Sequence, residues 1–348
     1  MSVENSDPIK IMRASLLLVE QSDSLTSKQI DDALSAILSG QIDSTMIEEW
    51  LRLISRHLPT TPEIIGGIQA LLRTTSLIPT NIACEKIVDT AGTGGAPKML
   101  NVSTLSALVI AACRGVVAKS GNRSRTGFGS SETLAALGVN IQAEPHTQAK
   151  MLGECGFCFC LASKHYPAAR FAADARKRIG TPTLFNAIGP LSNPAGALRQ
   201  VVGVWSRDLL APVAEVLARR GAIRAFVVHS ADGFDEVSVS DQTYGIEVVR
   251  GRVMGNVVFE PEQFGITRSK NPPRAAQNLE EATTVFRRLA SGVDSGPPLD
   301  LVVINAALGL IVADKASDPK SAALLAADAI QSGRVNALLE NVIKLSNE

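Results

Sequence analysis

The sequence predicts an α/β fold with a small all-helical N-terminal domain. Apolar residues recur at helical spacing up to about residue 72, whereas from about residue 80 short apolar runs alternate with helical patterns. Such alternation is typical of βαβ units that build a mostly parallel central sheet flanked by helices. We therefore expect a helical domain at residues 1–78 and an α/β domain at residues 79–348. A helical segment around residues 165–190 is expected to return to the first domain, with a cleft between the two.

Helix signals justify the first domain. Thr26 is a predicted N-cap, because Gln29 stands three residues later at the capping-box position. A second helix is predicted at residues 46–54. A third begins at Thr61–Pro62, because a proline at the first helical position gives up an N–H that would have no helical partner.

Five apolar runs justify the sheet of the second domain. They are KIVDT (86–90), GVVAKSG (115–121), GFCFCLA (156–162), QVVGVW (200–205) and RAFVVHS (224–230). Crossover helices are predicted at residues 105–113, 131–136 and 209–219. In such a sheet, ligands bind outside the carboxyl ends of the strands.

Composition and charge exclude several classes of protein. The chain is 45% hydrophobic and 20% charged, which is ordinary for a soluble globular protein. Its formal net charge of zero favours neither a nucleic-acid nor a membrane partner, so an anion site must be local. No secretory signal and no apolar run of about 18 residues is visible. We expect a cytoplasmic protein.

Five cysteines do not suggest a disulfide framework. Cys155, Cys158 and Cys160 lie in CGFCFC, where phenylalanines interleave with them as in a buried strand. Free cysteine packs as a small hydrophobe, and this interpretation is preferred to a metal site.

The stretch VDTAGTGGAPKMLNVST (88–104) has the features of a phosphate site. A strand runs into three glycines, Gly92, Gly94 and Gly95, whose backbone N–H groups no Cβ obstructs. Asn101 is placed to cap a following helix whose first turn holds Ser103 and Thr104. A helix N-terminus with free N–H groups attracts phosphate. The stretch matches neither the dinucleotide fingerprint nor the P-loop.

Two further loops follow predicted strands. In AKSGNRSRTGFGSSETLAALG (118–138), the cations Lys119, Arg123 and Arg125 share a loop with several hydroxyls, which suits a polyanion. In VVHSADGFDEVS (227–238), the carboxylates Asp235 and Glu236 follow a strand, which suits Mg²⁺ held together with substrate phosphates.

Motifs in this order resemble the anthranilate phosphoribosyltransferases, a family related to the pyrimidine nucleoside phosphorylases. They are GTGG…NVST, KSGNR…GSSETLAALGV, ARKRIGTPTLFNAIGPLSNP and DGFDEVS, together with the N-terminal LTSKQIDDALSAILSGQID and the late INAALGLIVA. The resemblance implies the same two-domain fold, dimerising through the helical part as a homodimer. It also implies that the amine of anthranilate displaces pyrophosphate from C1 of phosphoribosyl pyrophosphate, with Mg²⁺, in tryptophan biosynthesis.

The resemblance also implies the site residues. Phosphoribosyl pyrophosphate would contact Gly92, Gly95, Asn101, Val102, Ser103, Thr104, Lys119, Gly121, Asn122, Arg123, Ser124 and Ser130. Gly92, Asn122 and Arg176 would face the acceptor, and Ser103, Asp235 and Glu236 would hold metal. No catalytic acid or base is implied, because positioning and stabilisation of charge on the leaving pyrophosphate are expected to suffice.

Several positions depart from the family pattern. Ala96–Pro97 and Met99 replace the usual Asp-Gly and Thr, and both loops are one residue shorter. Ser120 stands in place of a histidine associated with the acceptor, and Tyr166 in place of another histidine. These changes leave alternatives open: a paralogue that transfers phosphoribose to another aromatic acceptor, a phosphorolytic relative, or a relative that binds a phosphorylated ligand without turnover.

Overall fold

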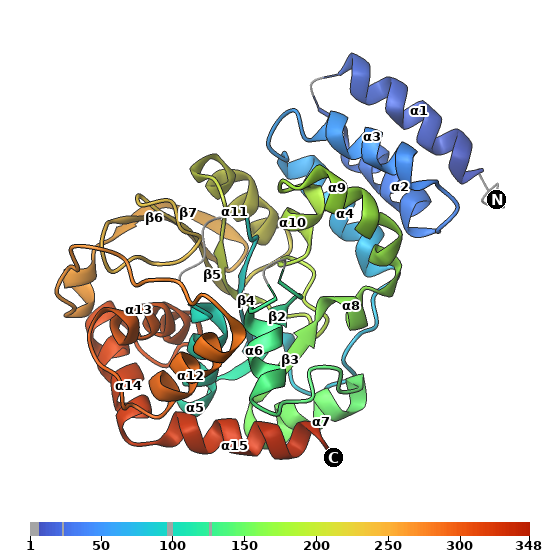
Figure 1. The fold of residues 1–348 in the computed structure, drawn as a ribbon. Coiled ribbons are helices and arrows are strands. Elements are labelled where there is room, and N and C mark those ends of the chain that lie inside the picture. Colours follow the sequence, from blue (N-terminus) through green and yellow to red (C-terminus); the bar gives the residue numbers. More distant parts are fainter. Residues whose placement is uncertain (1–6, 23, 96–99, 125–126) are drawn as a thin grey trace. The chain divides into compact units, whose positions relative to one another are not determined.

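The computed structural model describes residues 7–22, 24–95, 100–124 and 127–348. The described residues form two compact units, one within residues 1–76 and 163–192 and the other within residues 77–162 and 193–348. The predicted class is confirmed: a helical N-terminal part is followed by a mostly parallel sheet flanked by helices (Figure 1). Within the described residues, no helix is both long and apolar enough to span a lipid bilayer.

The first unit is helical. Its elements are α1 (Pro8–Gln21), α2 (Ser27–Leu38), α3 (Ser44–Ile54), α4 (Thr61–Leu72), the 3₁₀ helix η2 (Pro167–Ala172), α9 (Ala173–Ile179) and α10 (Leu184–Ile188). The predicted capping box of α2 is confirmed, since the backbone N–H of Thr26 donates to Gln29 Oε1 at 2.8 Å. Helix α4 begins at Thr61 as expected. Its N-cap is Thr60, whose backbone N–H donates to Glu63 Oε2 at 2.8 Å.

Helix α1 was not predicted as a separate element. Asp7 caps it, and Pro8 occupies its first position. The indole Nε1–H of the fully buried Trp50 donates to Ser15 Oγ at 2.8 Å, which ties α1 to α3. A polar contact of this kind satisfies a tryptophan that would otherwise bury its donor unpaired.

The second unit contains a seven-stranded sheet in the order β3-β2-β1-β4-β5-β6-β7. Its strands are β1 (Ile87–Gly92), β2 (Val116–Gly121), β3 (Phe157–Leu161), β4 (Arg199–Gly203), β5 (Arg224–Ser230), β6 (Thr243–Val249) and β7 (Arg252–Phe259). The first five are mutually parallel, as predicted. The antiparallel hairpin of β6 and β7 was not predicted, although Arg250 and Gly251 give it a turn of two residues with positive φ.

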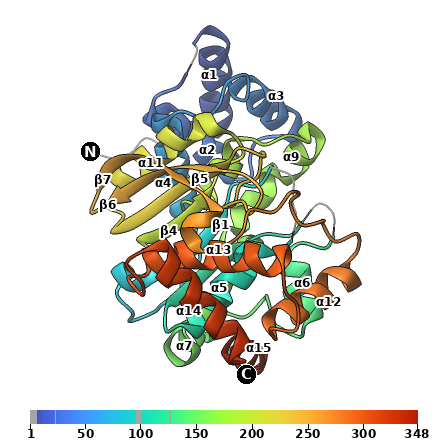
Figure 2. The ribbon, with the colours of Figure 1, turned by 90° about the vertical axis from the view of Figure 1, so that its left-hand side faces the viewer.

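The remaining elements cover the sheet. They are η1 (Cys84–Lys86), α5 (Val102–Ala112), α6 (Ser130–Ala136), α7 (Pro145–Cys155), α8 (Ala162–His165), η3 (Arg207–Leu209), α11 (Leu210–Arg219), η4 (Pro261–Phe264), α12 (Leu279–Ala290), α13 (Pro297–Val312), α14 (Pro319–Gln331) and α15 (Arg334–Ser346). Helices α5 and α13 pack against one face of the sheet, and α11 covers β5 and β6 on the other (Figure 2).

Helix α13 is fixed at its C-terminal end. Arg199 Nη1 donates to Val312 O at 2.6 Å, and Arg224 Nη1 donates to Ile311 O at 3.2 Å. Cations beside the last carbonyls of a helix satisfy orphan acceptors and oppose the helix dipole. Because these arginines begin β4 and β5, the helix is anchored to the amino ends of the two strands.

The predicted buried strand around CGFCFC is confirmed as β3. The side chains of Cys158 and Cys160 are buried, with their Sγ atoms 3.8 Å apart. Burial raises the pKa of the Cys160 thiol well above its ordinary value, so it stays protonated and packs as an apolar group.

Candidate active site

The strand order places a candidate site between β1 and β4. From β1 the chain adds β2 and β3 on one side, and then returns to add β4 on the other. A ligand binds characteristically outside the carboxyl ends of the strands at such a switch point. Two glycines end these strands side by side, since Gly92 and Gly203 are paired in the parallel ladder. Next to them, Thr93 N donates to Gly203 O at 2.8 Å.

The glycine-rich loop leaves β1 at this point. Gly94 and Gly95 have φ values of 62° and 96°, a region in which a side chain is strained. Ala96, Pro97, Lys98 and Met99 lie outside the described residues, so the structural effect of the departures from the family pattern there stays a prediction.

Helix α5 follows the glycine-rich loop in the sequence. Thr90 Oγ1 donates to Ser103 O at 2.9 Å, which fixes the first turn of the helix to β1. The side chains of Val102 and Thr104 are buried and that of Ser103 is half-buried, so this turn offers a ligand its backbone N–H groups and the Ser103 hydroxyl. Thr104 Oγ1 is buried without a hydrogen-bond partner among the described residues.

Asn101 occupies the predicted N-cap position, but the prediction that its side chain caps α5 is wrong. Its Nδ2 donates instead to Thr133 Oγ1 at 2.7 Å, and its Oδ1 accepts from Ser130 Oγ at 3.4 Å. Both partners belong to α6, so Asn101 connects the start of α5 to α6.

That second loop folds back onto the N-terminus of α6. Ser131 Oγ donates to Asn122 O at 3.0 Å, and Ser124 N lies 3.3 Å from both carboxylate oxygens of Glu132. A Cβ at Gly129 would lie 2.5 Å from Ser124 Cβ, so the loop needs a glycine there. Arg123 is exposed and Arg125 lies outside the described residues.

Gly121 ends β2 against an aromatic ring, because a Cβ there would lie 2.4 Å from Phe159 Cζ. Lys119, two residues earlier, is buried, with a relative exposure of 3%. The structure therefore places Asn122, Ser124 and Ser130 at the start of α6, whereas Lys119 is buried.

A buried polar network that the sequence did not reveal lies beside these loops. Asp89 Oδ1 accepts from Ser120 N at 3.0 Å, and Oδ2 accepts from Asn193 Nδ2 at 2.8 Å. Asn193 Nδ2 also lies 3.2 Å from Ser120 Oγ. Burial raises the pKa of Asp89, while the charge of Lys119 opposes that rise. The only sequence signal was a charged residue inside an apolar strand.

The acidic loop after β5 lies against the two strand-ending glycines. A Cβ at Gly203 would lie 1.7 Å from the backbone oxygen of Asp235, and a Cβ at Gly92 would lie 2.7 Å from Asp235 Oδ2. The Asp235 carboxylate is therefore beside the glycine-rich loop, as a shared anion and metal site requires. Asp232 has a different environment, because its Oδ2 accepts from Ser238 Oγ at 2.6 Å and from Ser240 Oγ at 2.8 Å.

The donor set fits Mg²⁺ better than a softer ion. Within the described ranges, no group of three or more His, Cys, Asp or Glu side chains is arranged to hold a metal. Asp235 and Glu236 supply two hard carboxylates, and Mg²⁺ is commonly bound by one or two carboxylates together with substrate phosphates.

Arg176 lies in the last turn of α9, in the helical unit. Its guanidinium carbon is 5.0 Å from the centre of the Phe185 ring, and its Nη2 donates to Asn186 Oδ1 at 3.4 Å. These contacts restrain a planar cation of the kind that binds carboxylates. The other predicted acceptor residues, Gly92 and Asn122, belong to the α/β unit.

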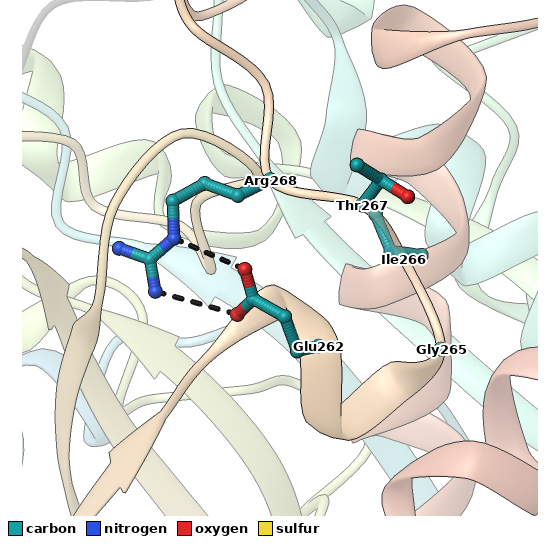
Figure 3. A pocket seen from close by; sticks show the side chains of 5 residues that line it. All are labelled: Glu262, Gly265, Ile266, Thr267 and Arg268. Carbon is teal, nitrogen blue, oxygen red and sulfur yellow. Dashed lines mark hydrogen bonds and ion pairs between the residues drawn. The ribbon is translucent and has the colours of Figure 1, made fainter.

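A surface pocket outside this group is lined by Glu262, Gly265, Ile266, Thr267 and Arg268 (Figure 3). The Arg268 guanidinium faces the Glu262 carboxylate and also pairs with Glu260. Because carboxylates already surround its one cation, the pocket does not resemble an anion site.

Comparison with known proteins agrees with this geometry. A model of a glycosyl transferase family, a/b domain, matches residues 84–336, which defines the chain as a member of that class. At 35% identity, 97% of the chain matches 100% of an anthranilate phosphoribosyltransferase from Geotalea uraniireducens. The relative from Aquifex aeolicus is 32% identical over 98% of the chain and 100% of its own length. The chain belongs to the anthranilate phosphoribosyltransferase family.

Solved structures support the same assignment. The crystal structure of the enzyme from Thermus thermophilus has a TM-score of 0.88 at 32% identity, and covers 97% of this chain and 99% of its own. The Saccharomyces cerevisiae enzyme in complex with PRPP and Mg has a TM-score of 0.86 at 24% identity, with 99% of each chain covered, which shows the shared fold.

Proposed function

We propose that this protein transfers the phosphoribosyl group of phosphoribosyl pyrophosphate to anthranilate, in tryptophan biosynthesis. The amine nitrogen attacks C1 of the ribose, the bond from C1 to the pyrophosphate oxygen breaks, and pyrophosphate leaves with the bonding electrons. The amine then releases a proton to give N-(5-phosphoribosyl)anthranilate. The observation that carries the proposal is the Asp235 carboxylate beside Gly92 and Gly203, at the switch point of the sheet.

The donor would lie over the glycine-rich loop and the N-terminus of α5. Gly92, Gly95 and the backbone N–H groups of residues 101–104 would bind its phosphates, because unpaired N–H groups and the helix dipole both favour an anion. The loop after β2 would complete this site with Lys119, Gly121, Asn122, Arg123, Ser124 and Ser130.

Asp235 and Glu236, with Ser103, would hold Mg²⁺ against the pyrophosphate. When bound, the ion would neutralise the charge that develops on the leaving group. The backbone donors of the glycine-rich loop act in the same direction, since they point to where negative charge increases.

The family resemblance assigns Arg176, Asn122 and Gly92 to the acceptor, and we propose that Arg176 binds its carboxylate. A restrained guanidinium binds a carboxylate through two parallel hydrogen bonds, which fixes the orientation of the aromatic ring. Anthranilate's amine is neutral at pH 7, so no strong general base is required. We further propose that the protein is a cytoplasmic homodimer.

One assay tests the proposal. Protein, phosphoribosyl pyrophosphate and Mg²⁺ are incubated with anthranilate, and the loss of anthranilate fluorescence is followed together with pyrophosphate release. We expect both signals with equal stoichiometry. Pyrophosphate release only with some other aromatic acid would support the paralogue, and no release with any acceptor would support a binding relative.

The environment of Ser120 supports an alternative, in which the acceptor is another aromatic acid. Ser120 stands where the family has a histidine, and its hydroxyl and N–H lie in the interior network with Asp89 and Asn193. A serine side chain bonded in this way cannot make the contacts with the acceptor that a histidine imidazole would make. The acceptor assay therefore includes other aromatic acids at the same concentration.

A further inference from the structure

The acidic loop is held by one side chain of the central helix α13. Asn305 Oδ1 accepts from Val237 N at 2.9 Å, and Asn305 Nδ2 donates to Val237 O at 2.9 Å and to Leu301 O at 2.9 Å. The side-chain amide thus pairs with both backbone groups of one residue, as a neighbouring strand would.

The bonded residue follows directly on the two carboxylates. The N–H that Asn305 accepts belongs to the peptide bond between Glu236 and Val237, so this contact sets the orientation of the backbone from which the acidic pair projects. Val237 is fully buried and Asn305 is 8% exposed, so water does not compete freely for these bonds.

The support behind Asn305 is rigid. Twelve residues of α13 are buried, and Arg199 and Arg224 fix its last carbonyls to β4 and β5. The close approach of Asp235 O to Gly203 also leaves the loop no room toward the end of β4. The loop is therefore confined between a strand end and a helix.

We propose that Asn305 is a positioning residue that holds the Asp235–Glu236 pair in its metal-binding arrangement. The inference rests on the proposed function's assignment of that pair to metal. Residues that orient metal ligands by hydrogen bonding typically change metal affinity by about 10- to 100-fold when they are replaced. A residue that only satisfies buried backbone would change stability and leave metal affinity unaltered.

The test is a Mn²⁺ titration in the presence of inorganic pyrophosphate, with free Mn²⁺ followed by electron paramagnetic resonance. Asn305→Leu keeps the branched shape and the number of heavy atoms of the side chain and removes its three hydrogen bonds. We expect its Mn²⁺ affinity to fall by about tenfold or more, and the exchange of the Val237 amide hydrogen to become faster.

The matched control is Ser106→Ala. Ser106 Oγ is buried and donates to Val302 O of α13 at 3.3 Å, about one helical turn before Asn305. We expect this variant to keep wild-type Mn²⁺ affinity. An Asn305→Leu affinity equal to wild type, or an equal loss in Ser106→Ala, would overturn the inference.

Two further arms keep the outcomes distinct. If Asn305→Leu does not fold, Asn305→Asp is titrated, since it retains an oxygen for the Val237 N–H but loses the donor to Val237 O, and it should also bind Mn²⁺ more weakly. Wild-type protein that binds Mn²⁺ but does not consume anthranilate would refute the proposed acceptor and leave the role of Asn305 supported. Wild-type protein that binds no Mn²⁺ would overturn the role of Asn305.

Discussion

Replacement of Gly203 by alanine tests whether the acidic loop must approach the end of β4. Gly203 has no positive φ, so its conformation does not demand glycine. What demands it is space, because an added Cβ would lie 1.7 Å from Asp235 O and 2.6 Å from Asp235 C.

The size of the effect follows from that distance. A carbon and an oxygen in ordinary contact are more than about 3 Å apart, so the loop or the strand must move by more than about 1 Å. Misplacement of a binding group by about 1 Å can lower a rate about 100-fold. Overpacking of one methyl group usually lowers the free energy of unfolding by only about 1–3 kcal/mol. We therefore expect Gly203→Ala to lower kcat/KM by about 100-fold in a protein that still folds.

The assay compares anthranilate consumption with urea unfolding in parallel. Gly153→Ala is the control, because Gly153 is an exposed residue of α7 and no atom lies within 4 Å of an added Cβ. Alanine in place of glycine in a helix raises the free energy of unfolding by about 0.5–1 kcal/mol, and turnover should stay unchanged. Wild-type kcat/KM in Gly203→Ala would refute the claim that this contact positions the acidic pair.

Three other changes test the remaining assignments. Asp235→Asn combined with Glu236→Gln should abolish both turnover and Mn²⁺ binding, and full activity would mean that the pair is only a solvated loop. Arg176→Gln should raise the KM for anthranilate by about 10- to 100-fold, the value of a hydrogen bond to a charged group, with little change in the KM for phosphoribosyl pyrophosphate; equal changes in both would contradict a role in binding the carboxylate. Burial lowers the pKa of His165, whose Nδ1 lies 2.6 Å from Ser76 O, so the unfolded chain binds the proton more readily and stability is lost as the pH falls below about 6.5. Urea unfolding between about pH 5 and 8 should show this slope in wild type and a weaker one in His165→Gln, and equal slopes would disprove it.

Local patterns were sufficient to predict most of the fold. The five parallel strands were visible as apolar runs, and the capping box at Thr26 correctly marked the start of α2. The hairpin of β6 and β7 was missed because its outer strand is largely exposed and carries no clear apolar alternation. Helix α1 was missed although its signals, an Asp-Pro start and a following apolar run, were local.

Parts of the candidate site were predictable for a different reason. Glycines at a strand end and paired carboxylates have chemistry that is visible in one stretch of sequence. The function of Gly203 and Asn305 is not local, because each acts on a backbone group of the acidic loop that is distant in sequence. The hydrogen-bond partners of Asn101 were predicted wrongly for the same reason, because Ser130 and Thr133 belong to another helix.

The contacts also separate two properties of the site. Ser120, which stands where the family has a histidine, is held by Asp89 and Asn193. The acidic pair is held by Gly203 and Asn305, which are different residues on different elements. A change at Ser120 therefore leaves in place the contacts that Gly203 and Asn305 make with the acidic loop.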